Sequence, residues 1–307
     1  MTQKEINRAV VTGSSGFIGK HLVSHLCKLG ISVLSIDMKK PPELHRGENF
    51  IEADITHDMS KIFQEGDTIF HLAANANVAK SVERPFEDFH HTLSSLVNIL
   101  EHAKNKDIKV VFPSTASIYD VDNTLPLSEK SFPRPSSPYG AAKLAGESYC
   151  YSYHRTYNLD VSVIRLFNVY GPGMTRFIIF DIVKKILANP DSIELLGNGQ
   201  QIRDYLYIDN VIEGFLKVAH NGKAGEDYNI ASGEGINIKD LAQKISMIMQ
   251  NKQIKITTSG KSWPGDISKW YACVEKAKTI DFYSTTSLDE GLIPTIESIK
   301  SFLRINS

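Results

Sequence analysis

The stretch Val10-Val11-Thr12-Gly13-Ser14-Ser15-Gly16-Phe17-Ile18-Gly19 decides the fold, because it joins an apolar run to three glycines spaced Gly-x-x-Gly-x-x-Gly. The run Arg8–Thr12 predicts a buried strand, and Ile18–Leu29 carries apolar residues at the three- and four-residue spacing of a helix. The glycines between them permit a tight turn. The stretch therefore predicts the first βα unit of an α/β fold.

A glycine-rich turn at the start of a helix also suits a phosphate, because free N–H groups and the positive end of the helix dipole point at the ligand. Asp37 ends the next predicted strand about 20 residues on, where a carboxylate accepts the hydroxyls of an adenosine ribose and repels a 2′-phosphate. A P-loop is excluded, because five residues separate Gly13 from Gly19 and Lys20 is followed by His21. A plain strand-to-helix turn is the alternative. We expect NAD to bind at Gly13, Gly16, Phe17, Ile18, Gly19 and Asp37.

Length and composition narrow the class of protein. The 307 residues suggest about two domains or one large one, and 42% hydrophobic with 22% charged residues is typical of a globular protein. The formal charge of −1 gives no attraction to nucleic acid or to an anionic membrane. No apolar run is long enough to span a bilayer, and the charged N-terminus lacks a secretory signal. The three cysteines, Cys27, Cys150 and Cys273, are far apart in the sequence, which fits reduced thiols rather than disulfides or a zinc site. We therefore expect a cytoplasmic protein without a bound metal.

Strand and helix signals alternate through the first half of the chain. This rhythm predicts a Rossmann-type doubly wound parallel sheet with helices on both faces. After Gly171 the pattern loosens, and only Ile238–Gln250 gives a strong helix signal, so we expect a smaller C-terminal lobe. The other predicted strands are Ile31–Ile36, Asn49–Ala53, Thr68–His71, Ile108–Pro113 and Val161–Leu166, and the other predicted helices are Glu87–Lys104 and Tyr139–Tyr157.

Three polar residues form a candidate catalytic group. Tyr139 and Lys143 are four apart on a predicted helix and share a face. A cation about 4 Å from a phenol lowers its pKa by roughly three units at an effective dielectric of 20, which makes a tyrosinate accessible. Thr115 closes the predicted fifth strand, at the end of the sheet where open α/β folds bind ligands. We therefore expect Tyr139 to act as general base, with Lys143 lowering its pKa and Thr115 holding a substrate hydroxyl. A structural tyrosine beside a solvated lysine is the alternative.

Over nearly the whole chain, these motifs resemble the extended short-chain dehydrogenase/reductase family, in particular its NAD-dependent nucleotide-sugar epimerase/dehydratase branch. The resemblance implies a Rossmann domain, with NAD as its cofactor and a nucleotide sugar as substrate. The motifs that carry it are Thr12–Gly19, Asp54-Ile55, His71–Ala74, Ser114–Tyr119, Tyr139–Lys143, Arg165–Pro172 and Gly197–Tyr205.

The resemblance also implies roles and boundaries that the residues alone do not give. Asp54 and Ile55 would flank the adenine, and Leu72, Ala73 and Ala74 the middle of the cofactor. The Rossmann domain would comprise residues 1–168 and about 202–230, and the substrate lobe about 169–201 and 231–307. A homodimer would form through the helices matching Glu87–Lys104 and Tyr139–Tyr157. Substrate contacts would come from Thr115, Asn168, Arg203, Asp266 and Trp270.

Departures from the family pattern narrow the reaction. Relatives that dehydrate carry an Asp-Glu pair directly after the threonine, where this chain has Ala116 and Ser117. Trp263 stands where relatives usually have an arginine on the diphosphate, and Lys261 is the candidate to replace that cation. By the same resemblance, the bulk of Trp270 favours a sugar without an N-acetyl group. We therefore expect a 4-epimerase of a UDP-hexose or UDP-hexuronate that works through a transient 4-keto sugar. A 4-ketosugar reductase or dehydratase and a non-catalytic NAD sensor are the alternatives.

Overall fold

The computed structural model describes residues 5–59, 61–251, 253–260 and 269–305. Its centre is a seven-stranded sheet with the order β10-β6-β5-β4-β1-β2-β3, in which every neighbouring pair is parallel. The chain runs from β1 outward through β2 to β3 and then crosses to the other side of β1 with β4. The strands are β1 (Arg8–Thr12), β2 (Ser32–Asp37), β3 (Glu48–Glu52), β4 (Asp67–His71), β5 (Lys109–Thr115), β6 (Asp160–Leu166) and β10 (Asp227–Ile230).

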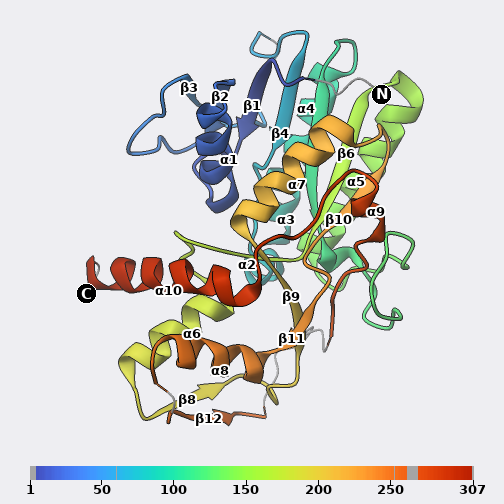
Figure 1. The fold of residues 1–307 in the computed structure, drawn as a ribbon. Coiled ribbons are helices and arrows are strands. Elements are labelled where there is room, and N and C mark those ends of the chain that lie inside the picture. The colour runs from blue at the N-terminus through green and yellow to red at the C-terminus, as the bar shows by residue number, and fades with distance from the viewer. Residues whose placement is uncertain (1–4, 60, 252, 261–268, 306–307) are drawn as a thin grey trace.

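Helices cover both faces of this sheet, which is why its inner strands are apolar almost without interruption. One hydrophobic cluster joins one face of the sheet to α1 (Phe17–Lys28) and α7 (Ile208–Asn221). A second cluster joins the other face to α4 (Ser95–Ala103) and α5 (Pro138–Tyr157). Figure 1 shows α7 crossing in front of the sheet. The predicted doubly wound parallel sheet is confirmed.

The helix predicted over Glu87–Lys104 is interrupted. It begins as α3 (Pro85–Phe89), passes through a π-helical turn at His90–Ser94 and continues as α4. A π turn inserts one extra residue into the helical repeat, so the side chains before and after it point in directions that a regular helix would not give. The short helix α2 (Val78–Glu83) precedes α3 and packs against it.

The C-terminal part of the chain builds a separate core below the carboxyl ends of the strands, as Figure 1 shows. Only Ile238–Gln250 was expected there as a helix, and it forms α8 (Ile238–Ile248). None of the helices in the described ranges is both long and apolar enough to cross a membrane. The other elements are α6 (Phe177–Ala188), α9 (Glu275–Lys278), α10 (Leu288–Ile305), the sheet β11-β9-β7 (Gly235–Asn237, Ile202–Tyr207, Asn168–Tyr170) and the pair β12-β8 (Lys255–Thr258, Ser192–Leu195).

Candidate active site

A cavity of about 950 Å³ lies at the carboxyl ends of β1, β4 and β5, where the strand order reverses. It brings together residues that are up to 257 positions apart in the sequence, from Gly13 to Trp270. Asp266, which was expected to contact the substrate, lies outside the described residues, as do Lys261 and Trp263. The predicted site residues that line the cavity are Gly13, Gly16, Phe17, Ile18, Gly19, Asp37, Asp54, Ile55, Leu72, Ala73, Ala74, Thr115, Tyr139, Lys143, Asn168, Arg203 and Trp270.

The glycine turn forms one wall of this cavity, and it fits a dinucleotide phosphate. Gly13 has a φ of +67°, and a Cβ there would lie 2.7 Å from the backbone nitrogen of Ala73, so no other residue is accommodated. Helix α1 begins directly after Gly16, and no side chain caps its first N–H groups. These free donors and the positive end of the dipole face the cavity, as a pyrophosphate would require.

Asp37 sits at the cavity edge of β2, where the ribose hydroxyls were expected. Its Oδ2 accepts a hydrogen bond from the backbone N–H of Ser15 at 3.0 Å, and its Oδ1 accepts one from the N–H of Lys39 at 3.0 Å. These bonds fix the carboxylate against the glycine turn. Asp54 also lies at this end, and the backbone N–H of Thr56 lowers the pKa of its carboxyl by hydrogen bonding.

Helix α5 places the candidate catalytic pair. It starts with Pro138 at its first position, and the Ser137 side chain accepts a hydrogen bond from the N–H of Gly140 at 3.2 Å. A Cβ on Gly140 would lie 2.5 Å from the carbonyl oxygen of Ser117, so glycine lets the helix start press against the loop that follows Thr115. Tyr139 and Thr115 are close as a result, and a hydrogen bond from Thr115 acts on the Tyr139 hydroxyl.

The expected effect of Lys143 on Tyr139 stays a prediction, because the structure shows the lysine ammonium bound to another group. The Lys143 ammonium donates a hydrogen bond to the backbone oxygen of Pro113 at 2.7 Å and lies 4.6 Å from the centre of the Phe112 ring. The ammonium is therefore bonded to the backbone of β5, although Lys143 also lines the cavity. Burial raises the pKa of Tyr139 to about 12, and Lys143 is not among the groups that lower it. Burial also lowers the pKa of Lys143 to about 8.

The far end of the cavity combines a cation with aromatic surface. The Arg203 guanidinium lies 5.2 Å from the centre of the Trp270 ring, and its Nη1 donates to the carbonyl oxygen of Ile202 at 2.9 Å. The Asn168 amide donates to the carbonyl oxygen of Asp204 at 2.9 Å. Within the described ranges, the buried Tyr205 hydroxyl and the Trp270 indole N–H have no hydrogen-bond partner. Both polar atoms are suited to a bound ligand.

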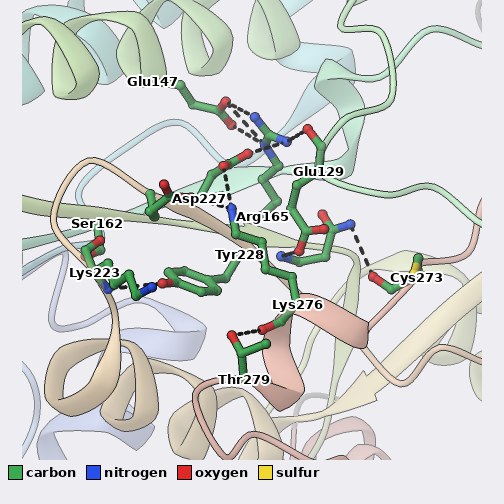
Figure 2. A network of polar contacts seen from close by, with 12 residues as sticks. Glu129, Glu147, Ser162, Arg165, Lys223, Asp227, Tyr228, Cys273, Lys276 and Thr279 are labelled. Carbon is green, nitrogen blue, oxygen red and sulfur yellow. Dashed lines mark hydrogen bonds and ion pairs between the residues drawn. The ribbon is translucent and has the colours of Figure 1, made fainter. Parts of the chain in front are cut away.

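An ion-pair network holds α5 to the sheet from behind the cavity. Figure 2 shows Arg165 of β6 between Glu147 of α5 and Asp227 of β10. Its Nη2 lies 2.6 Å from Glu147 Oε2, and its Nη1 lies 2.6 Å from Asp227 Oδ2 and donates to the Tyr119 hydroxyl at 3.0 Å. Lys276 binds the other oxygen of Asp227 at 3.1 Å. Glu147 is one turn beyond Lys143, so this network fixes the position of the catalytic helix.

Comparison with known proteins places this chain in a family. The model of the NAD dependent epimerase/dehydratase family matches residues 9–231. The chain belongs to this family. Membership confirms the resemblance seen in the sequence, the Rossmann-type fold and NAD as the cofactor of this enzyme.

Several relatives with named activities align with nearly the full length of this chain. A putative UDP-glucose 4-epimerase of Methanocaldococcus jannaschii is 30% identical and covers 95% of this chain and 98% of its own. The UDP-N-acetylglucosamine 4-epimerase of Methanobrevibacter ruminantium, solved with UDP-N-acetylmuramic acid, has a TM-score of 0.89 at 30% identity, over 97% of this chain and 99% of that one. The UDP-glucuronic acid 4-epimerase of Bacillus cereus, solved as a variant with a fluorinated UDP-glucuronic acid and NAD, has a TM-score of 0.87 at 30% identity, over 96% and 99%.

Several cavity residues were not singled out from the sequence. Arg176 lines the cavity opposite α5, and its charge lowers the pKa of Tyr139. It lies after Gly171, where the apolar residues no longer follow a regular strand or helix spacing, so the sequence gives no signal for it. Tyr205 ends the family motif Gly197–Tyr205, but the sequence of that motif does not show which way its side chain points. Asn75 directly follows the predicted Leu72–Ala74 segment and could have been found by extending it.

Proposed function

We propose that this chain is a cytoplasmic nucleotide-sugar 4-epimerase that acts on a UDP-hexose or a UDP-hexuronate. The observation that carries the proposal is the convergence of Thr115, Tyr139 and Lys143 on the cavity that the glycine turn also lines. The names of the relatives described above agree with it. A cytoplasmic location is supported by the cysteines, all of which are free thiols: Cys27, Cys150 and Cys273.

Tyr139 is the proposed general acid and base. The glycine turn and Asp37 would hold NAD, which would supply a hydride acceptor and donor for the sugar. In its deprotonated form, the Tyr139 phenolate would take the proton of the 4-hydroxyl, and the phenol so formed would return that proton to the 4-keto oxygen. The Thr115 hydroxyl, which already bonds Tyr139, orients the reacting oxygen. Lys143 keeps a positive charge under the site and would hold the nicotinamide ribose after leaving the Pro113 carbonyl.

The groups after Thr115 favour epimerisation over dehydration. Ala116 is buried and apolar, and the backbone N–H of Ser117 donates to the Thr115 hydroxyl at 3.2 Å. Neither position offers the carboxylate that removal of water from the sugar ring would require. Epimerisation at C4 needs one group that takes and returns a proton, and Tyr139 supplies it.

A panel of nucleotide sugars tests the proposed activity. We expect the purified chain to interconvert the 4-epimers of UDP-glucose or UDP-glucuronate without net consumption of added NADH or NADPH, followed by NMR of the anomeric proton. UDP-N-acetylglucosamine should react at least about tenfold more slowly, because the bulky Trp270 lines the cavity and the family resemblance predicts that it restricts the space for an N-acetyl group. Stoichiometric oxidation of NADPH with a 4-keto sugar would instead identify a reductase.

We further propose that the chain forms a homodimer through α3, α4 and α5. Apolar side chains are exposed on α3 and α5, among them Phe86 at 81%, Phe89 at 48% and Tyr149 at 43%. Exposed apolar side chains that gather on neighbouring helices favour association. Light scattering behind size exclusion should give twice the monomer mass. Phe89→Glu should yield monomer and Phe132→Glu, in an exposed loop, should not, and a wild-type monomer would refute the dimer.

A further inference from the structure

Asp88 is a buried carboxylate beside the catalytic helix that the proposed reaction does not use. Its side chain has no solvent exposure, and its Oδ1 accepts a hydrogen bond from the Asn75 amide at 3.0 Å. Its Oδ2 has no hydrogen-bond partner among the residues that the structure describes. A buried, half-satisfied carboxylate costs stability, so its presence calls for a functional reason.

The helix that carries Asp88 exposes its apolar side chains and buries this acidic one. In α3 the two phenylalanines, Phe86 and Phe89, are exposed, whereas the aspartate between them faces the interior. The π-helical turn begins two residues after Asp88, at His90. Helix α3 packs against α5, which carries Tyr139 and Lys143 in its first turns. The fold therefore buries this carboxylate on a helix that contacts the catalytic helix.

Charges couple Asp88 to that pair in both directions. Burial raises the pKa of Asp88, while the Asn75 hydrogen bond and the charges of Lys143 and His91 lower it. In return, the carboxylate raises the pKa of both Lys143 and Tyr139. The titratable groups on the elements packed against α3 include Tyr139, Lys143, Glu147 and Cys150 on α5, His90 and His91 on the π turn, and the exposed Lys80 and Glu83 on α2. Among these, Glu147 and Cys150 also raise the pKa of Lys143.

We propose that Asp88 is a positioning residue of the epimerase site. Its carboxylate anchors the Asn75 amide in the wall of the cofactor cavity and supplies a negative charge within electrostatic range of the buried Lys143 ammonium. The anchor holds the segment that follows β4, where Leu72–Ala74 line the cavity. The charge keeps Lys143 protonated in spite of its burial. This inference rests on the proposed function, because Lys143 and Tyr139 act in that reaction.

Two substitutions separate the charge from the anchor. Asp88→Asn removes the charge but keeps an oxygen that accepts from Asn75, whereas Asp88→Ala removes both. Asp67→Asn is the matched control, because Asp67 is equally buried and has a raised pKa but lies at the opposite end of β4. The measurements are the pH profile of kcat, the Kd for NAD by calorimetry on the cofactor-free protein, and the urea unfolding midpoint as a check of folding.

The expected results differ between the variants. Asp88→Asn should move the acid limb of the kcat profile to lower pH by about one unit, because loss of the negative charge lowers the pKa of Tyr139 and Lys143, and its Kd for NAD should stay within about twofold. Asp88→Ala should raise the Kd for NAD about five- to tenfold. Asp67→Asn should change neither quantity.

Both effects are required, and the absence of either one overturns the proposal. If the pH profile of kcat for Asp88→Asn superimposes on that of the wild type, the proposed role of the charge is refuted. If the Kd of Asp88→Ala for NAD is unchanged, the proposed anchoring of Asn75 is refuted. If the wild-type chain epimerises none of the sugars in the panel, the proposed function fails by itself. The NAD measurements still decide the anchor in that case.

Discussion

Tyr139→Phe is expected to reduce kcat for 4-epimerisation by about a thousandfold, because it removes only the hydroxyl that takes and returns the substrate proton. The ring remains to fill its place at the start of α5, so the fold should be kept. Of the neighbours that act on this hydroxyl, Thr115 is the one that hydrogen bonds to it. The NAD content of the purified protein and its urea unfolding midpoint should therefore stay close to the wild-type values.

Tyr149→Phe is the matched control for this experiment. Tyr149 lies on the same helix but is 43% exposed and outside the cavity lining, so loss of its hydroxyl should leave kcat within about twofold. Initial rates with the sugar that the panel identifies, measured at several pH values, give the comparison. Substantial turnover by Tyr139→Phe at any pH would exclude Tyr139 as the group that moves the proton.

Arg165→Met is expected to lower the free energy of unfolding by about 3–5 kcal/mol, because it leaves the buried Glu147 carboxylate without its cation. The side chains of Arg165 and Glu147 are 10% and 9% exposed, so water cannot replace the lost partner. The Arg165 guanidinium also bonds the Tyr119 hydroxyl and the Glu129 carbonyl oxygen, at 3.0 Å each. Urea unfolding monitored by circular dichroism measures the loss.

A second cation of the same network supplies the control. Lys276 also pairs with Asp227, but its side chain is 30% exposed and its other partner, Glu226, is 48% exposed. Lys276→Met should therefore cost at most about 1 kcal/mol. Equal losses for the two substitutions would show that burial does not decide the strength of this network.

The first half of the fold was open to prediction because its elements are long and periodic. The strand Arg8–Thr12, the glycine turn and the helix that carries Tyr139 and Lys143 each combine an apolar pattern with a local signal such as Gly13 or Pro138. The helix α7 has equally regular spacing at Ile208, Val211 and Phe215, and the same criteria would have found it. Strands of three or four residues, such as β7 and β10, give too short a pattern to recognise.

The site was predictable as a set of residues but not as an electrostatic arrangement. Spacing places Lys143 on the same helix face as Tyr139, but it does not show that the ammonium turns away to the Pro113 carbonyl. Burial then governs the pKa of Tyr139. Asp88 was also beyond sequence reasoning, because a five-residue helix is too short to reveal that its acidic side chain is the buried one.

The outermost strand β10 comes from residues 227–230, whereas its neighbour β6 ends at Leu166. While the chain leaves the ribosome, β6 therefore has an unpaired edge until some 60 further residues have been synthesised, and Arg165 lacks Asp227 for the same interval. A nascent polypeptide halted between these points would expose a long apolar strand edge, which invites association with other chains. Truncations that end before residue 230 should need chaperones to stay dispersed.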